Sequence, residues 1–233
     1  MSIAKARKSQ KEEKSLTVLI LGSSHNTRLR NCGAKSCLVM PDSRYLINHQ
    51  LDIIKRYNPQ EIFMTIGYDA DRVIERNFGL KLIENQIYKE TGEAEDLRLF
   101  FNLHTPERLL IVSGDLYLRL AIVGDTQYTG SWCVGSDGTD NKDEIGFSSE
   151  FDIINGFSYI FRSKFSGLIM LEGLELELMK RYLNRETTRC ATWEILEGII
   201  KKGASIKPIH VPTNRLVKLH GIRDLNSLKN NFT

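Results

Sequence analysis

The feature that most constrains the fold is a short, almost entirely apolar run that ends abruptly in a polar loop. Residues 16–21 have the sequence LTVLIL, and the residues that follow at 22–26, GSSHN, are small or polar. Continuous apolar runs of this length, β-branched in part, are typical of strands buried on both faces of a parallel sheet. Two further runs of this kind, EIFMTIG at 61–67 and LLIVS at 109–113, predict two more buried strands.

Helical patterns separate these predicted strands. Apolar residues recur at helical spacing in 44–57, before a stop at Pro59, and again in 69–77 and 93–103. A short strand is expected at 80–84. The alternation of strands and helices predicts an α/β fold, with a doubly wound, mostly parallel mixed sheet flanked by helices.

The second half of the chain is less regular. Residues 129–150 are rich in glycine, serine and aspartate, which favours long loops or antiparallel hairpins. Residues 151–161 are expected to form a strand with a glycine near its middle. Helices at 174–183 and 192–202 and strands at 206–211 and 216–219 are expected to complete the domain.

Composition and charge place the chain among ordinary globular proteins. The 233 residues are 41% hydrophobic and 26% charged, and we expect one domain at residues 16–230 after a flexible basic tail at 1–15. A net charge of +3 gives no general nucleic-acid footprint, and no apolar run approaches the roughly 20 residues that span a bilayer. We therefore expect a cytoplasmic protein with reduced cysteines and neither a nucleic-acid nor a membrane partner; homo-oligomers are left open.

Candidate binding residues follow the first and third buried strands. Ligands of open α/β sheets bind outside the carboxyl ends of the strands, so the loop after residue 21 and Asp115 should converge on one crevice. The loop offers small side chains that let backbone N–H groups approach phosphate oxygens, and Arg28, Arg30 and Lys35 add positive charge. Asp115 supplies a lone carboxylate that can hold a divalent cation.

At these residues the sequence resembles the nucleoside-triphosphate transferase family, which includes sugar-1-phosphate nucleotidyltransferases and phosphocholine cytidylyltransferases. The family's first loop has the pattern AAGxGTRL followed by PKxL, and the corresponding stretches here are GSSHNTRL at 22–29 and AKSCL at 34–38. Other segments resemble the family in the same order: IGY at 66–68, ENQIY at 84–88, EDL at 95–97, VSGD at 112–115, the strand at 153–161 and LVKLHGIRDL at 216–225.

The resemblance implies an enzyme of a Rossmann-like nucleotidyltransferase fold. It would use Mg²⁺ to transfer a nucleoside monophosphate from a nucleoside triphosphate to a small phosphorylated acceptor, a sugar 1-phosphate or a phosphocholine-like compound, with release of pyrophosphate. Arg28 would contact the β and γ phosphates, Lys35 the α-phosphate region, and Asp115 the metal. The nucleotide-binding residues that it implies are Gly22, Ser23, Ser24, Asn26, Thr27, Asn85 and Gly114.

Several departures from the family pattern leave a second hypothesis open. Ser24 and Asn26 replace two loop glycines, and the family's second metal-binding aspartate aligns with Lys218, unless a shift of a few residues brings Asp224 there. A lysine would repel Mg²⁺, so the alternative is a catalytically impaired binding or regulatory module. A glycosyltransferase is a weaker third hypothesis, because no DxD motif is evident after a strand. Neither the base nor the acceptor follows from these residues.

Overall fold

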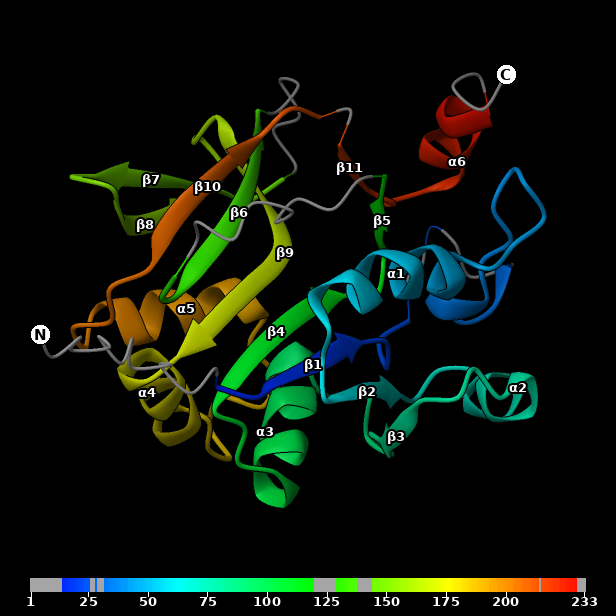
Figure 1. The fold of residues 1–233 in the computed structure, drawn as a ribbon, viewed down its shortest axis with the longest axis horizontal. Helices are drawn as coiled ribbons and strands as arrows, with labels where there is room; N and C mark the ends of the chain where they lie inside the picture. The colour runs from blue at the N-terminus through cyan, green and yellow to red at the C-terminus, as the bar shows by residue number, and fades with distance from the viewer. Residues whose placement is uncertain are drawn as a thin grey trace, which may run out of the picture.

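The computed structural model describes residues 14–25, 28, 32–119, 129–137, 144–213 and 215–229. Its described residues form a nine-stranded mixed sheet with helices on both faces and a small second sheet at one end (Figure 1). The large sheet contains β1 (Leu16–Leu21), β2 (Glu61–Ile66), β3 (Lys81–Glu84), β4 (Arg108–Ser113), β6 (Trp132–Asp137), β7 (Gly146–Glu150), β8 (Ile153–Ser158), β9 (Ser163–Glu172) and β10 (Lys207–Val211). The small sheet contains β5 (Leu116–Leu118) and β11 (Leu216–Lys218).

The helices are α1 (Leu46–Ile54), α2 (Ala70–Arg76), α3 (Glu93–Leu103), α4 (Leu174–Tyr182), α5 (Thr192–Ile200) and α6 (Ile222–Lys229), with 3₁₀ turns η2 (Lys35–Cys37) and η3 (Lys55–Tyr57). The bounds of α1 to α5 lie within a few residues of the sequence expectations, whereas α6 and η2 were not predicted. The expected helix at 44–57 divides into α1 and the turn η3. No described helix is long and apolar enough to cross a membrane.

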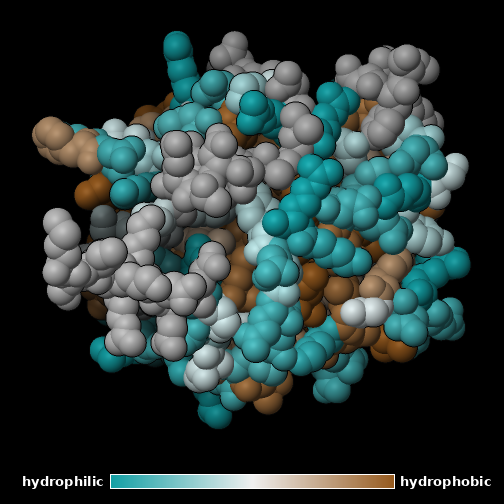
Figure 2. Space-filling model, viewed as in Figure 1, coloured by the Kyte–Doolittle hydropathy of each residue, from teal (hydrophilic) through white to brown (hydrophobic). Residues whose placement is uncertain are grey.

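The parallel half of the sheet explains the apolar runs. β1 lies between β2 and β4, parallel to both, and all six of its residues are buried. Leu19 and Leu21 pack into a core with α3, α4 and α5, whereas Val18 and Ile20 pack on the other face with α1. On the face that α1 covers, hydrophilic side chains lie at the surface with hydrophobic side chains exposed between them (Figure 2). Because both faces of the strand are covered, the run is continuous instead of alternating. The doubly wound α/β fold predicted from the sequence is confirmed.

The sheet continues through β9, which the sequence analysis did not predict. β9 is antiparallel to both β4 and β6, and the sheet order is β10-β6-β9-β4-β1-β2-β3. The strand expected at 151–161 exists only as β8, which pairs with β7 off this path. β9 is buried almost throughout its length. Lys164 and Gly167 interrupt its apolar pattern, and for this reason the strand was not recognised in the sequence.

The C-terminal segment returns to the end of β4. β11 pairs antiparallel with β5, which begins directly after Asp115, and the Leu219 N–H donates to the Asp115 carbonyl at 2.9 Å. Leu219 and Leu225 are buried in a small cluster with Tyr117 of β5 and Leu46 of α1. This cluster fixes the C-terminal segment beside the carboxyl ends of β1 and β4. The division into a tail at 1–15 and one domain stays a prediction, and residues 1–13 of that tail lie outside the described residues.

Candidate nucleotide-binding site

The loop that follows β1 begins with two residues fixed by neighbouring elements. The Gly22 N–H donates to Thr65 Oγ1 of β2 at 3.0 Å, and a Cβ at Gly22 would lie 2.7 Å from the Thr65 carbonyl oxygen. A side chain would therefore clash with the β2 backbone. Ser23 is also tied to this side, because its carbonyl accepts the Tyr68 N–H at 2.9 Å. The start of the loop is held to the end of β2.

Asp96 of α3 is the centre of the network beneath this loop. Its buried carboxylate accepts hydrogen bonds from Ser23 Oγ at 2.6 and 2.7 Å, from Thr65 Oγ1 at 2.7 Å and from Asn85 Nδ2 at 2.9 Å. Burial raises the pKa of Asp96, and the hydrogen bonds from these three donors oppose that rise. Asp96 was not among the site residues predicted from the sequence. The available signal was a carboxylate one turn before Phe100 on the apolar face of a helix, because a buried charge needs partners.

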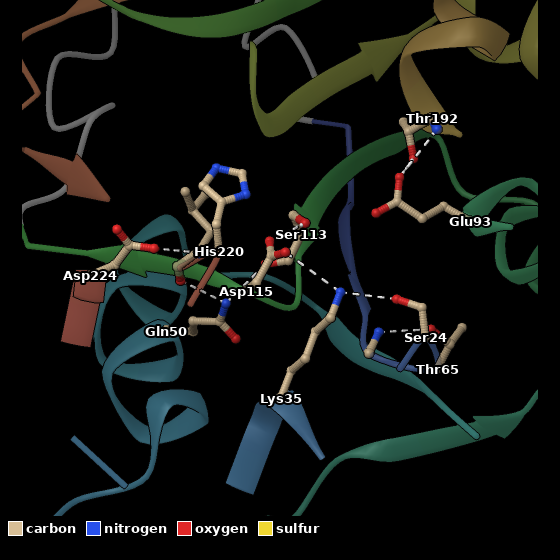
Figure 3. A network of polar contacts seen from close by, with 12 residues as sticks. Ser24, Lys35, Gln50, Thr65, Glu93, Ser113, Asp115, Thr192, His220 and Asp224 are labelled. Carbon is tan, nitrogen blue, oxygen red and sulfur yellow. Dashed lines mark hydrogen bonds and ion pairs between the residues drawn. The ribbon is translucent and has the colours of Figure 1, made fainter. Parts of the chain in front are cut away.

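Lys35 joins the first loop to the end of β4. It lies in η2 with only 9% of its surface exposed, and its Nζ donates to Ser24 Oγ at 2.9 Å. The same Nζ lies 3.5 Å from Asp115 Oδ2, so the ammonium stands between the two groups (Figure 3). The predicted convergence of Ser24, Lys35 and Asp115 at neighbouring strand ends is therefore present in the structure.

The charges of this cluster stabilise one another. Burial alone would raise the pKa of Asp115, but the charge of Lys35 and then that of Lys218 hold it well below its usual range, helped by a 2.7 Å hydrogen bond from Ser113 Oγ. Burial alone would lower the pKa of Lys35, and the Asp115 charge raises it above its ordinary value. Both groups are charged at neutral pH.

The turn that carries Asp115 is fixed from two sides. The Gly114 N–H donates to the Leu21 carbonyl at 2.9 Å, and a Cβ at Gly114 would lie 2.4 Å from that oxygen. Gln50 of α1, fully buried, donates from Nε2 to the carbonyls of Ser113 at 3.0 Å and Leu116 at 2.8 Å (Figure 3). Gln50 was not predicted. A lone amide on the apolar face of α1 was its only sequence signal.

The C-terminal segment places a lysine close to the Asp115 backbone. Lys218 lies opposite Leu116 in the β11–β5 pair, one residue from the Leu219 bond to Asp115. The Asp224 carboxylate accepts the N–H groups of His220 at 2.7 Å and Gly221 at 2.9 Å, so it caps the start of α6. The alternative in which Asp224 provides the second acidic group stays a prediction.

The remaining predicted residues are placed as follows. Asn26 and Thr27 lie outside the described residues. Arg28 is exposed and lies beside the C-terminal segment, where a Cβ on Gly221 would be 3.7 Å from Arg28 Cβ. Asn85 is buried, and its amide donates to Asp96 at 2.9 Å and to Thr91 Oγ1 at 3.2 Å. Its predicted contact with a base stays a prediction.

The residues around Asp115 fit a divalent cation poorly. Mg²⁺ prefers oxygen ligands, with one or two carboxylates and substrate phosphates. Asp115 is already paired with Lys35, and Lys218 adds a second positive charge. Among the described parts of the chain no cluster of three or more histidine, cysteine or acidic side chains is arranged to hold a metal. Two ammonium groups against one carboxylate favour an anion at this position.

Comparisons with solved structures identify the fold. CTP:phosphocholine cytidylyltransferase from Streptococcus pneumoniae superposes with a TM-score of 0.77 at 16% identity, covering 94% of this chain and 100% of that one. The inositol-1-phosphate CTP transferase from T. maritima superposes with a TM-score of 0.74 at 14% identity, covering 93% and 94% of the two chains. This chain has the nucleotidyltransferase fold.

A third protein of this fold gives the same result. The nucleoside-diphosphate-sugar pyrophosphorylase from Vibrio cholerae RC9 superposes with a TM-score of 0.73 at 14% identity, covering 92% of this chain and 99% of that one. No protein-family model matches the sequence, and the comparison with curated proteins finds no match. The nucleotidyltransferase fold implied by the sequence resemblance is confirmed over nearly the whole chain, whereas the substrates named for these proteins are theirs.

Proposed function

We propose that the chain is a nucleotidyltransferase that binds a nucleoside triphosphate between the loop after β1 and the end of β4. The observation that carries the proposal is the position of Lys35 Nζ, 2.9 Å from Ser24 Oγ and 3.5 Å from Asp115 Oδ2. An ammonium at the carboxyl ends of two parallel strands lies where ligands of open α/β sheets bind. In this fold such a group is suited to a phosphate chain.

The reaction requires charge neutralisation more than proton transfer. An oxygen of the acceptor phosphate attacks the α-phosphorus, the bond from that phosphorus to the bridging oxygen breaks, and pyrophosphate leaves. Lys35 would contact the α-phosphate region and exchange part of its interaction with Asp115 for a phosphate oxygen. Arg28 would contact the β and γ phosphates. Positioning and electrostatic stabilisation then supply the rate enhancement.

The acceptor in this proposal is a small phosphorylated compound, either a sugar 1-phosphate or an amino-alcohol phosphate such as phosphocholine. The names of the structural neighbours, which act on phosphocholine and inositol 1-phosphate, support this class. The proposed setting is the cytoplasm, which agrees with four free cysteines. Because the site fits Mg²⁺ poorly, the metal implied by the sequence resemblance is assigned no step.

A binding or regulatory module without turnover is the second candidate. The specific observation that favours it is Lys218, a basic residue in β11 next to the Asp115 backbone. Such a module would retain the Lys35 contact with a nucleotide and release no pyrophosphate.

A pyrophosphate-release screen tests the proposal. CTP, UTP, dTTP and GTP are combined with phosphocholine, inositol 1-phosphate and glucose 1-phosphate, with Mg²⁺ and with EDTA. We expect release with one pair, and its loss in Lys35→Ala and Asp115→Ala. Lys207→Ala is the matched control, because Lys207 is exposed at the amino end of β10, away from the site. Nucleotide binding without release supports the module, and full activity in both site variants contradicts the assignment.

A further inference from the structure

We infer that the ammonium of Lys218 takes the place of a divalent cation beside Asp115, so that the site binds nucleotide phosphates without metal. This inference rests on the proposed function and deepens it, because it names the cation that neutralises the bound nucleotide. It differs from the sequence resemblance, which implies Mg²⁺ as the cofactor.

The register of the β11–β5 pair fixes the backbone position of Lys218. Lys218 lies directly opposite Leu116, and the next residue, Leu219, donates its N–H to the Asp115 carbonyl at 2.9 Å. Leu219 is fully buried. A shift of one residue would exchange the fully buried Leu219 with half-buried Lys218 or His220, which favours the observed register. The strand pairing therefore fixes the backbone of Lys218 at this end of the sheet.

The side chain of Lys218 is confined near the same strand ends. Lys218 is half-buried, and its Nζ lies 5.8 Å from the centroid of the Phe165 ring on β9. A lysine over an aromatic face gains a cation–π interaction. This contact keeps the ammonium close to the sheet end, where its charge acts on the buried carboxylate of Asp115.

The charges nearest Asp115 favour an anion over a second cation. The charged groups that lower the pKa of its carboxylate are Lys35, then Lys218 and, more weakly, His220, and a hydrogen bond from Ser113 adds to their effect. Glu144 Oε1 lies 3.2 Å from His220 Nε2, and the charges of Glu93 and Asp96 act on Lys35. Asp224 is engaged by the backbone of His220 and Gly221. A divalent ion at Asp115 would meet two ammonium groups, whereas a phosphate would be attracted by both.

Two measurements on the full chain test the inference. The first is an electron paramagnetic resonance titration with Mn²⁺ alone. The second is calorimetric titration of CTP, UTP, dTTP and GTP, in EDTA and in Mg²⁺. The variants are Lys218→Asp, which restores a possible metal ligand, and Lys218→Met, which removes the charge. Lys207→Asp is the charge-matched control on the exposed surface.

For the wild type we expect no bound Mn²⁺ and dissociation constants that agree within about threefold with and without Mg²⁺, a difference below ~1 kcal/mol. Lys218→Met should bind nucleotide about tenfold more weakly in both conditions. Lys218→Asp should bind Mn²⁺ and should need Mg²⁺ for nucleotide binding. Lys207→Asp should behave as the wild type.

The results that would contradict the inference differ in what they imply for the proposed function. Nucleotide binding by the wild type that strengthens about tenfold or more with Mg²⁺ overturns the inference and leaves the proposed function standing. Binding of Mn²⁺ by the wild type also overturns it. Absence of binding to all four nucleotides in both conditions overturns the proposed function and the inference together. If circular dichroism shows Lys218→Asp to be unfolded, the wild-type comparison and Lys218→Met decide the question.

Discussion

Lys35 Nζ lies 3.5 Å from Asp115 Oδ2, although 80 residues separate the two along the chain. Both side chains are buried, and each comes from a segment just beyond the carboxyl end of a parallel strand. The pair is therefore a direct contact between the first loop and the turn after β4. The expected behaviour of the site follows from this contact.

Removal of either partner should destabilise the protein, because it leaves an uncompensated buried charge. Lys35→Met and Asp115→Asn should each lower the free energy of unfolding by about 3–5 kcal/mol. The double variant should lose less than the sum of the two. Urea unfolding of the four proteins gives the coupling, and strictly additive losses would show that the two groups do not interact.

The same pair should make stability depend on pH in acid. The folded pKa of Asp115 is lowered, so the unfolded chain takes up the proton first as the pH falls. The contribution of Asp115 to the free energy of unfolding is fully present at pH values above the ordinary aspartate pKa of about 3.9, and it is lost as the pH falls below that value. Urea unfolding should show the largest difference between wild type and Asp115→Asn near neutral pH, shrinking in acid. If the difference in stability between wild type and Asp115→Asn grew in acid, the pKa of Asp115 would be raised in the folded protein instead of lowered.

Asp96 should act as a positioning residue for the first loop. Asp96→Asn replaces the acceptor of Ser23, Thr65 and Asn85 with an amide that cannot serve all three donors. We expect nucleotide binding, measured by calorimetry, to weaken by about tenfold, the equivalent of ~1.4 kcal/mol.

The matched control for this change is Glu95→Gln on the same helix. Glu95 is buried as well, but its carboxylate accepts two hydrogen bonds at 2.7 Å from Arg98 of the same helix. Glu95→Gln should change stability and leave nucleotide affinity unaltered. Equal losses of affinity in the two variants would mean that Asp96 acts only through the stability of α3.

Gly114 should be intolerant of a side chain for a packing reason. A Cβ there would lie 2.4 Å from the Leu21 carbonyl oxygen, and Gly114→Ala should lower the free energy of unfolding by about 1–3 kcal/mol. At Gly156 a Cβ would meet nothing closer than Ser148 Oγ at 4.0 Å. Gly156→Ala should therefore stay within about 1 kcal/mol of the wild type in the same urea measurement. Similar losses at both positions would contradict the packing account.

The parallel half of the fold could be predicted because its strands are buried on both faces. A continuous apolar run such as LTVLIL can be recognised as a strand from its own sequence, without knowledge of the strands beside it. β9 was missed because Lys164 and Gly167 break its pattern, and only the structure shows why they are tolerated. Lys164 Nζ donates to the carbonyls of Glu144 at 3.0 Å and Tyr159 at 3.3 Å, and Gly167 has a φ of +84°.

The candidate site was predicted to the same uneven extent. Lys35 and Asp115 could be placed because both follow strands whose carboxyl ends must be adjacent. Asp96 and Gln50 were missed because their partners are distant in sequence, 73 residues away for Ser23 and 66 for Leu116. A buried polar side chain shows that partners exist without showing which residues they are.

The most direct test of the central claim is an amide NMR titration of the full chain with the same four nucleoside triphosphates. The account predicts that the largest shift changes fall on Ser23, Ser24 and Lys35 and on the Gly114–Asp115 turn. A hollow lined by Lys55, Asn58 and Lys81 lies at the opposite, amino ends of β2 and β3. Largest changes there, with the residues of the first loop and the β4 turn unmoved, would contradict a nucleotide site at the carboxyl ends of β1 and β4.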